Sequence, residues 1–408
     1  MKKIRIISVV ISALLILSAC SKNIENTYGG EIETTSETTV ITTEETVITT
    51  EAIPEDITVR VTAAGDNLIH SSIYNQAHNR SEDGTYDFEY AYENIRTLIC
   101  GDLNILNQET PICNDIFEPS TYPCFNSPTQ LGDEMLSLGF NAFCHANNHI
   151  LDKGMKGVEA TLDYWSDKDA VVYGAYRNED DMNNIRTRNV NGINFSFVGF
   201  TEHTNGIRIP EDSDIKVIYT SDLETIEKQI KSARLQSDVV VVSVHWGVEN
   251  SHIITDAQRE LAQKMADWGA DIIIGTHPHV IQNMDELTSS DGRNVLVVYS
   301  LGNFISAQNV GNRMIGGVLD FNVTKSFKND SITIDEIKFI PVITHYDYGY
   351  SNIRVYPFSE YTREMASSHG VRSNSHFDYD FILETLRNNV DEKYLVLDNI
   401  EEKTDVAA

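Results

Sequence analysis

The chain has 408 residues and a formal net charge of −30, because 61 acidic residues outnumber 31 lysines and arginines. This excess of negative charge argues against nucleic acid binding, which needs clustered positive charge, and against extended contact with an anionic lipid surface. The chain is long enough to bury a sizeable core.

The first 20 residues have the pattern of a secretory signal peptide, with a basic start and an apolar run over residues 6–17. That run is too short to span a bilayer, which needs roughly 20 apolar residues. The sequence LSAC, which ends at Cys20, resembles a bacterial lipobox, in which the cysteine is lipidated. We therefore expect an extracytoplasmic protein with a lipid anchor to the cell membrane at Cys20; an ordinary signal peptide is the alternative.

Residues 21–57 are expected to form a disordered linker. The segment is rich in threonine and glutamate and contains TVITTE twice, at residues 39–44 and 46–51. Such a composition cannot bury enough apolar surface to offset the entropy of ordering. Its predicted role is to hold the folded part away from the membrane.

From residue 58 onward, short apolar runs alternate with amphipathic stretches, which is typical of a layered α/β domain with a buried sheet. Helices are predicted over 221–236 and 255–269, the second with an N-cap at Thr255. The main domain is expected over 58–310, and the strands and helix of 311–408 are expected to complete it. The predicted strands of the main domain are 57–66, 102–109, 141–149, 194–200, 238–247, 271–279 and 295–304.

Side chains that can bind metal gather where these apolar strands end. Ligands of open α/β sheets bind at the carboxyl ends of the strands. Imidazole, carboxylate and amide oxygen together suit Mn, Fe or Zn, and two such ions would share a carboxylate. We therefore expect one or two divalent metal ions there. The candidate residues at these strand ends are Asp66, Asn107, Glu109, Asn147, Asn148, His149, His245, His277, His279 and Asn303.

Each residue also has a structural interpretation. A histidine after a strand is more often a hydrogen-bonded structural residue, and Asp66 or Asn148 could be a turn residue. Glu109 could be a solvated loop end, and His70 remains open between a ligand role and a loop role. His145 could face toward His149 or away from it, depending on where the strand ends, so both histidines are left out of the core set. Several strand ends in one chain, each with a ligand-capable side chain, favour a joint site.

Six segments of the chain resemble motifs of the poly-γ-glutamate capsule synthesis protein CapA family. They are, in chain order, AAGDNLIH, GDLNILNQET, CHANNHILDKG, VSVHWGVE, IIGTHPHVIQ and YSLGNFI, and the match runs over residues 59–305. The family is related to calcineurin-like metallophosphoesterases. The resemblance therefore implies a four-layer α/β/β/α sandwich of the metallo-dependent phosphatase type.

The resemblance also implies roles for the site residues. Asp66 matches the metal-binding aspartate of the first motif, and Glu109 the carboxylate that bridges two metals. His149 matches the histidine that protonates a leaving group or steadies an oxyanion. The metal ligands that the resemblance implies are Asp66, Glu109, Asn148, His245, His277 and His279.

Three departures from the family pattern bear on this site. No histidine stands two residues after Asp66, so one metal lacks its usual histidine unless His70 substitutes. The usual NLE is NQE here, with Gln108 expected on the opposite face from the site. Cys144 and His145 stand where the family has small or apolar residues. These departures leave the occupancy of two metal positions open.

For function, the resemblance implies a cell-surface lipoprotein that acts in the synthesis, export or anchoring of an anionic polymer such as poly-γ-glutamate. Its implied partners are the polymer and a capsule synthesis complex. The alternative is a metal-dependent phosphoesterase, or another hydrolase, acting on extracellular or lipid-linked substrates with His149 as the acid. Fold and family do not determine the reaction, so the resemblance leaves open whether the protein catalyses one.

Four further cysteines would lie outside the membrane, where disulfides can persist. They are Cys100, Cys113, Cys124 and Cys144. Cys113 and Cys124 flank a loop that they could close, but four cysteines allow three connectivities.

Overall fold

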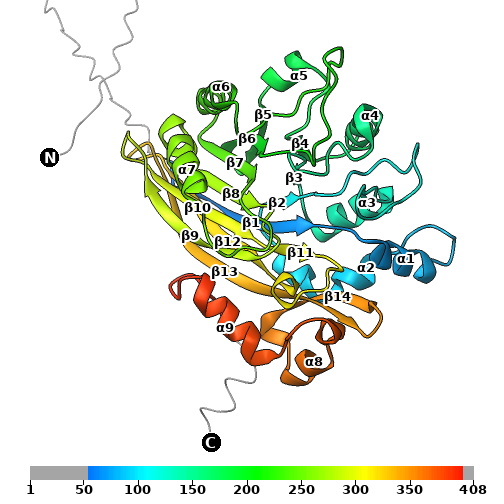
Figure 1. Cartoon of the computed structure of the whole chain (residues 1–408). Helices are drawn as coiled ribbons and strands as arrows, with labels where there is room; N and C mark the ends of the chain where they lie inside the picture. Colours follow the sequence, from blue (N-terminus) through cyan, green and yellow to red (C-terminus); the bar gives the residue numbers. More distant parts are fainter. Residues whose placement is uncertain (1–53, 398–408) are drawn as a thin grey trace, which may run out of the picture. The chain divides into compact units, whose positions relative to one another are not determined.

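The structure is a computed structural model that describes residues 54–397 (Figure 1). The predicted signal peptide with Cys20, and the predicted linker up to residue 53, lie outside the described residues. Within residues 54–397, no helix has the length and apolar character needed to span a bilayer.

The first sheet has eight strands in the order β14-β13-β12-β1-β2-β3-β4, with β11 paired to β1. Strands β1 to β4 are mutually parallel, whereas β12 runs antiparallel to β1, so the strands after residue 311 share a sheet with β1. The bounds are β1 Ile57–Asn67, β2 Leu103–Asn107, β3 Ala142–Cys144, β4 Val171–Tyr173, β11 Asn303–Ile305, β12 Ile315–Ser326, β13 Ser331–Asp347 and β14 Ser351–Pro357.

The second sheet has six strands in the order β5-β6-β7-β8-β10-β9. Strands β6, β7, β8 and β10 are parallel, so their carboxyl ends lie at one edge of this sheet. The bounds are β5 Arg186–Val190, β6 Ile193–Thr201, β7 Val239–His245, β8 Ile272–Thr276, β9 Ile281–Thr288 and β10 Asn294–Leu301.

The two sheets pack face to face through a mostly apolar core. The Tyr173 ring of β4 lies 5.5 Å from the Phe197 ring of β6, and the Tyr173 hydroxyl is 2.7 Å from Ser243 Oγ of β7. On the outer face of the first sheet, Phe143 of β3 packs on Trp165 with ring centroids 4.2 Å apart. Trp165 belongs to a helix, so this sheet is covered on its outer side.

Helices cover the outer faces of both sheets (Figure 1). Ile230 of α6 and Met265 of α7 pack in one buried cluster with Val242 and Ile273 of the second sheet. The expected four-layer α/β/β/α sandwich is therefore confirmed. The α-helices of the described residues are α1 Ser71–Arg80, α2 Glu89–Tyr92, α3 Thr129–Leu138, α4 Gly154–Trp165, α5 Glu179–Asn183, α6 Leu223–Arg234, α7 Asp256–Trp268, α8 Arg363–Ser368 and α9 Tyr379–Asn389.

Several predicted strands end earlier than expected, and those over 102–109 and 238–247 stop two residues early, at Asn107 and His245. The strand predicted over 141–149 stops at Cys144, and the one over 271–279 stops at Thr276. His277 and His279 have φ angles of 99° and 59°, so the backbone of the pair is not extended. Such angles are uncommon for residues other than glycine. The two imidazoles are therefore oriented by a turn and not by strand alternation.

The strand predicted over 295–304 is divided between the two sheets. β10 ends at Leu301 in the second sheet, and β11 begins at Asn303 in the first. Gly302, with a φ of 67°, makes the crossing. A side chain at Gly65 would place its Cβ 1.9 Å from the Gly302 carbonyl oxygen, so the two sheets can meet here only because Gly65 has none.

The four cysteines of the described residues are free thiols. The possible closure of the loop between Cys113 and Cys124 is therefore not formed. Cys113 instead contacts Asn126, with its Sγ 3.0 Å from the amide oxygen.

Thr255 caps α7 as predicted, and its loss is expected to destabilise the fold. Its Oγ1 accepts from the Gln258 amide at 3.2 Å, while Gln258 Oε1 accepts from the Thr255 amide at 2.9 Å. Thr255→Ala should lower the free energy of unfolding by about 0.5–2 kcal/mol in urea titration. Glu260→Ala, at an exposed position of the same helix, is the control and should change it little. Equal values for both variants would contradict the capping role.

Candidate metal centre

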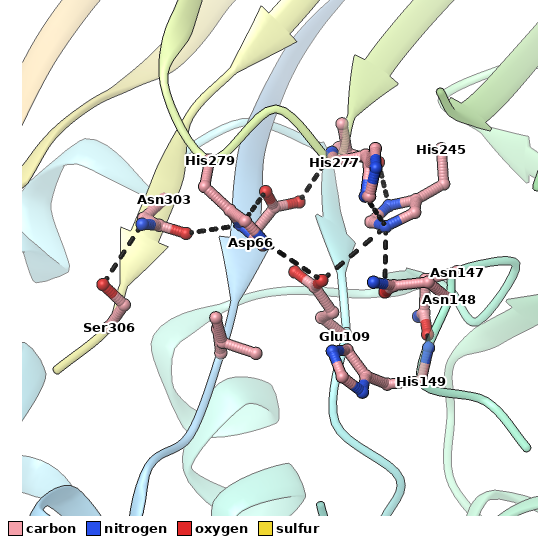
Figure 2. Close-up of polar contacts among 12 residues, drawn as sticks. Asp66, Glu109, Asn147, Asn148, His149, His245, His277, His279, Asn303 and Ser306 are labelled. Carbon is pink, nitrogen blue, oxygen red and sulfur yellow. Dashed lines mark hydrogen bonds and ion pairs between the residues drawn. The ribbon is translucent and has the colours of Figure 1, made fainter. Parts of the chain in front are cut away.

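The predicted ligands meet where strands of both sheets end (Figure 2). Asp66 lies near the end of β1 and Glu109 just after β2, whereas His245 ends β7. Asn148 follows β3, and His277 and His279 follow β8. The structure thus brings together, at one edge, six residues that span more than 200 positions of the sequence.

A first group of donors consists of Asp66, Glu109 and His279, all of which are buried. The Asp66 Oδ2 atom lies 3.0 Å from His279 Nδ1, and His279 Nε2 lies 3.7 Å from Glu109 Oε1. One ligand atom from each residue falls within 4.8 Å of the others. This spacing suits donors that surround a single cation.

A second group of donors gathers around His245 Nε2. This nitrogen lies 3.1 Å from Asn148 Oδ1, 3.0 Å from His277 Nδ1 and 3.6 Å from Glu109 Oε1. Glu109 Oε1 therefore faces both groups, which is the position that the resemblance implied for a bridging carboxylate.

Neighbouring polar side chains orient these donors. Thr276 Oγ1 is 2.9 Å from His245 Nδ1, which leaves Nε2 of that ring to face the site. Asn107 donates from Nδ2 to Asp66 Oδ1 at 2.8 Å. Asn303 Oδ1 lies 3.1 Å from His279 Nδ1. Partners of this kind hold metal ligands in place and select the tautomer of a histidine.

The donor set fits a divalent metal ion because the Glu109 carboxylate lacks a hydrogen-bond partner in the described residues. Both of its oxygens are buried without one there, and Asp66 Oδ2 faces the His279 ring at 3.0 Å, which is itself a predicted ligand. Burial, followed by the charge of Asp66, raises the pKa of Glu109 well above its ordinary value. A buried, unpaired carboxylate is costly, and a cation would offset that cost. Oxygen and imidazole donors together suit Mn, Fe or Zn.

The histidines of the second group are held in the neutral form that metal binding needs. Burial, followed by the neighbouring histidines, lowers the pKa of His245 well below its usual value. The same causes lower the pKa of His277 to about 3. Because a metal ion binds the neutral imidazole, neither ring has to lose a proton to become a ligand at neutral pH.

His149 lies beside these donors but has a different set of partners. Its Nδ1 is 2.7 Å from Asp152 Oδ2, and its ring packs edge-on against Phe125 at 4.7 Å. Because a carboxylate oxygen accepts, Nδ1 donates to Asp152, and Nε2 is the ring nitrogen left for the site. Asn205 Nδ2 also lies 3.3 Å from Nδ1. Asp152 is a site residue that the sequence analysis missed, although its place three residues after His149 was visible.

Glu249 was also missed. Its exposed carboxylate has an oxygen within 4.8 Å of ligand nitrogens of His277 and His279. It belongs to the HWGVE segment, of which only the histidine was taken as a ligand. The motif itself was therefore the signal that could have found it.

The residues that departed from the family pattern lie outside the two donor groups. His70 is in neither group of candidate metal ligands among the described residues, and its Nδ1 lies 3.2 Å from the Ala307 amide. His145 is buried near Trp165, with ring centroids 6.0 Å apart. Gln108 accepts from Asn67 Nδ2 at 2.8 Å and belongs to neither donor group.

Comparison with known families identifies similar proteins. A family model described as bacterial capsule synthesis protein PGA_cap matches residues 60–308. The PGA biosynthesis protein CapA of Bacillus subtilis (strain 168) is 31% identical over 210 residues, which cover 50% of this chain and 54% of that protein. The capsule biosynthesis protein CapA of Bacillus anthracis is 36% identical over 173 residues, which cover 42% and 41%. The chain thus spans about half the length of the curated relatives it matches.

Solved structures show a distant similarity. A phosphatase from Mycoplasma pneumoniae has a TM-score of 0.43 and 11% identity, covering 71% of this chain and 95% of that one. A putative 5'-nucleotidase from Staphylococcus aureus has a TM-score of 0.44 and 14% identity, covering 69% and 54%. Haemophilus influenzae NAD nucleotidase has a TM-score of 0.43 and 13% identity, covering 87% and 60%. At these identities the similarity concerns only the fold.

The lack of partners around Glu109 leads to a prediction about stability. Glu109→Gln replaces a buried carboxyl, whose ionised form burial disfavours, with a neutral amide, so the metal-free variant should melt at the same temperature as the wild type or higher. Added Mn²⁺ should stabilise the wild type, by about 2.7 kcal/mol at a hundredfold excess over Kd, but not the variant. Thermal unfolding with and without Mn²⁺, after treatment with a chelator, measures both effects.

Asp320→Asn is the matched control for this experiment. Asp320 is a largely buried carboxylate that accepts from Arg60 Nε at 2.7 Å and stands opposite Thr62 of β1, outside both donor groups. Its replacement should lower the melting temperature and leave the response to Mn²⁺ intact. A Glu109→Gln variant that behaves in the same way would contradict the assignment of Glu109.

Proposed function

The chain belongs to the bacterial capsule synthesis protein PGA_cap family, and we propose that it acts in the synthesis, export or anchoring of an anionic surface polymer such as poly-γ-glutamate. The names of the two Bacillus relatives support this context. The observation that carries a metal-dependent role is the shared, unpartnered Glu109 carboxylate between His245 and His279.

The proposal includes the place of action and the partners. A lipid at Cys20 would anchor the protein outside the cytoplasm, and the linker of 21–57 would extend the folded part from the membrane. The partners would be the polymer and a capsule synthesis complex. This part rests on the sequence pattern of the first 57 residues and on the family.

In the proposed site, Asp66, Glu109 and His279 would hold one divalent ion, and a second would share Glu109. The ligands of the second would be Glu109, Asn148, His245 and His277. Bound metal supplies a Lewis acid and lowers the pKa of bound water. His149 would hold or move a proton at Nε2, while Asp152 keeps the proton on Nδ1.

A second candidate function is that of a metal-dependent phosphoesterase or another hydrolase. It is favoured by the pairing of His149 with Asp152 at 2.7 Å. This histidine is in neither donor group, and a binding site has no need of a positioned proton donor. General acid catalysis is the chemistry that such a pair performs.

Metal content is the first test of the proposed function. The purified full chain should hold one or two transition-metal ions, and a His277→Ala, His279→Ala double variant should lose them while remaining folded. Elemental analysis and circular dichroism measure the two properties. If neither protein holds metal after Mn and Zn have been supplied, the histidine pair is structural and the metal-dependent role is wrong.

His149→Ala distinguishes the two candidate functions. If His149 is an acid, turnover of the cleaved substrate should fall by about 10²–10⁴-fold while metal content stays nearly constant. Hydrolysis assays with phosphoesters and poly-γ-glutamate, beside polymer production in cells that carry the variant, provide the readouts. Normal polymer production together with no hydrolysis by the wild type would count against the hydrolase.

A further inference from the structure

Arg313 lies on a loop that is tied to the metal centre through Asn303. It belongs to the short 3-10 helix η2 (Gly311–Met314), between β11 and β12. Its carbonyl oxygen accepts from Asn303 Nδ2 at 2.9 Å, and Asn303 Oδ1 contacts His279 Nδ1 at 3.1 Å. Asn303 Nδ2 also lies 2.9 Å from Gln308 Oε1, so one side chain joins this loop to a predicted metal ligand.

The guanidinium of Arg313 has no partner among the described residues. No hydrogen bond or ion pair of its side chain with residues 54–397 occurs, and its Nε is buried and unsatisfied. Other partly buried arginines of this chain are paired: Arg293 with Asp271 at 3.0 Å, and Arg60 with Asp320 at 2.7 Å. In a chain with 61 acidic residues, an unpaired and partly buried arginine is unexpected.

The backbone of Arg313 lies beside the metal centre, because Asn303 contacts both its carbonyl oxygen and the His279 ring. Burial lowers the pKa of Arg313, and the charge of Glu249 counteracts this effect. Burial is also the main cause that lowers the pKa of His70 to about 4, and the charges of His279, His149 and Arg313 add to it. The electrostatic neighbours of Arg313 therefore agree with the position of its backbone.

We propose that Arg313 binds an oxyanion group of the ligand, a phosphate or a carboxylate, beside the metal centre. The planar guanidinium offers paired N–H donors whose spacing matches the two oxygens of such a group. A bound oxyanion would give the guanidinium the partner that the described residues do not supply. The inference deepens the proposed function and rests on it for the nature of the ligand.

Oxyanion binding by Arg313 would also explain how an anionic ligand can bind to this acidic protein. With a net charge of −30, the protein as a whole repels an anionic ligand. Glu249 adds a negative charge at the rim of the site. The guanidinium of Arg313 is not neutralised by a neighbouring acid among the described residues, and its charge does not depend on bound metal. It can therefore attract an anionic ligand to the edge of the sheets where the donors converge.

The test compares Arg313→Met, which keeps much of the apolar stem, with Arg313→Lys and the wild type. The full chain, both Mn²⁺-loaded and metal-free, is titrated with inorganic phosphate and with L-glutamate in a calorimeter. Arg313→Met should weaken binding of at least one anion by about tenfold or more, the effect of losing a charge-assisted hydrogen bond. The anion affinity of Arg313→Lys should lie between those of the wild type and Arg313→Met, because lysine keeps the positive charge but lacks the paired N–H donors of a guanidinium.

Arg259→Met is the matched control. Arg259 is exposed and pairs with Asp285 at 3.3 Å, so its replacement should leave the affinity for both anions unchanged. Without anion, Arg313→Met should hold as much metal as the wild type and melt at the same temperature or higher, since a partly buried unpaired charge is removed.

The outcomes separate this inference from the proposed function. An effect on phosphate alone indicates a phosphoryl ligand, and one on glutamate alone indicates a carboxylate polymer; either supports the proposal. Equal affinities of wild type and Arg313→Met, or no binding of either anion by the wild type, would overturn it. If the protein holds no metal, the metal centre is wrong, but the metal-free titration still decides the role of Arg313.

Discussion

The buried carboxylate of Glu109 is the constraint around which the site is organised. Neither of its oxygens has a hydrogen-bond partner in the described residues, yet His245 and His279 approach it at 3.6 and 3.7 Å. An uncompensated buried charge is among the most costly features of a folded protein. Several strands end in residues whose side chains face this carboxylate. A cation bound among them would offset the negative charge of Glu109 and so explain the arrangement.

The close meeting of the two sheets makes this arrangement possible. Asp66 comes from the first sheet and His277 from the second, and the His277 amide lies 3.4 Å from Asp66 Oδ1. The chain passes from one sheet to the other at Gly302, against which Gly65 packs without a side chain. Two glycines thus permit the backbone approach that puts carboxylates and imidazoles within reach of one another.

The two donor groups are unequal, and the difference bears on ligand binding. The second group has four donors, whereas the first has Asp66, Glu109 and His279 only. His70, which could have completed the first group, instead lies against the Ala307 amide. A metal position with three protein ligands keeps coordination sites open for substrate or water. The open side of the site would therefore belong to the first group, near the loop that carries Arg313.

The sequence by itself determined the layered α/β class, the main strands and which side chains that can bind metal follow those strands. These features are local: apolar runs predict strands, and the residue that follows each run is read directly. Only the tertiary structure decided which oxygen of Glu109 faces which histidine, that His149 pairs with Asp152, and that Asn303 contacts His279. It also showed that His277 and His279 lie in a turn with positive φ angles. Such contacts join segments far apart in the chain, so no local pattern encodes them, and the absence of a partner, as at Arg313, can be recognised only when all neighbours are in place.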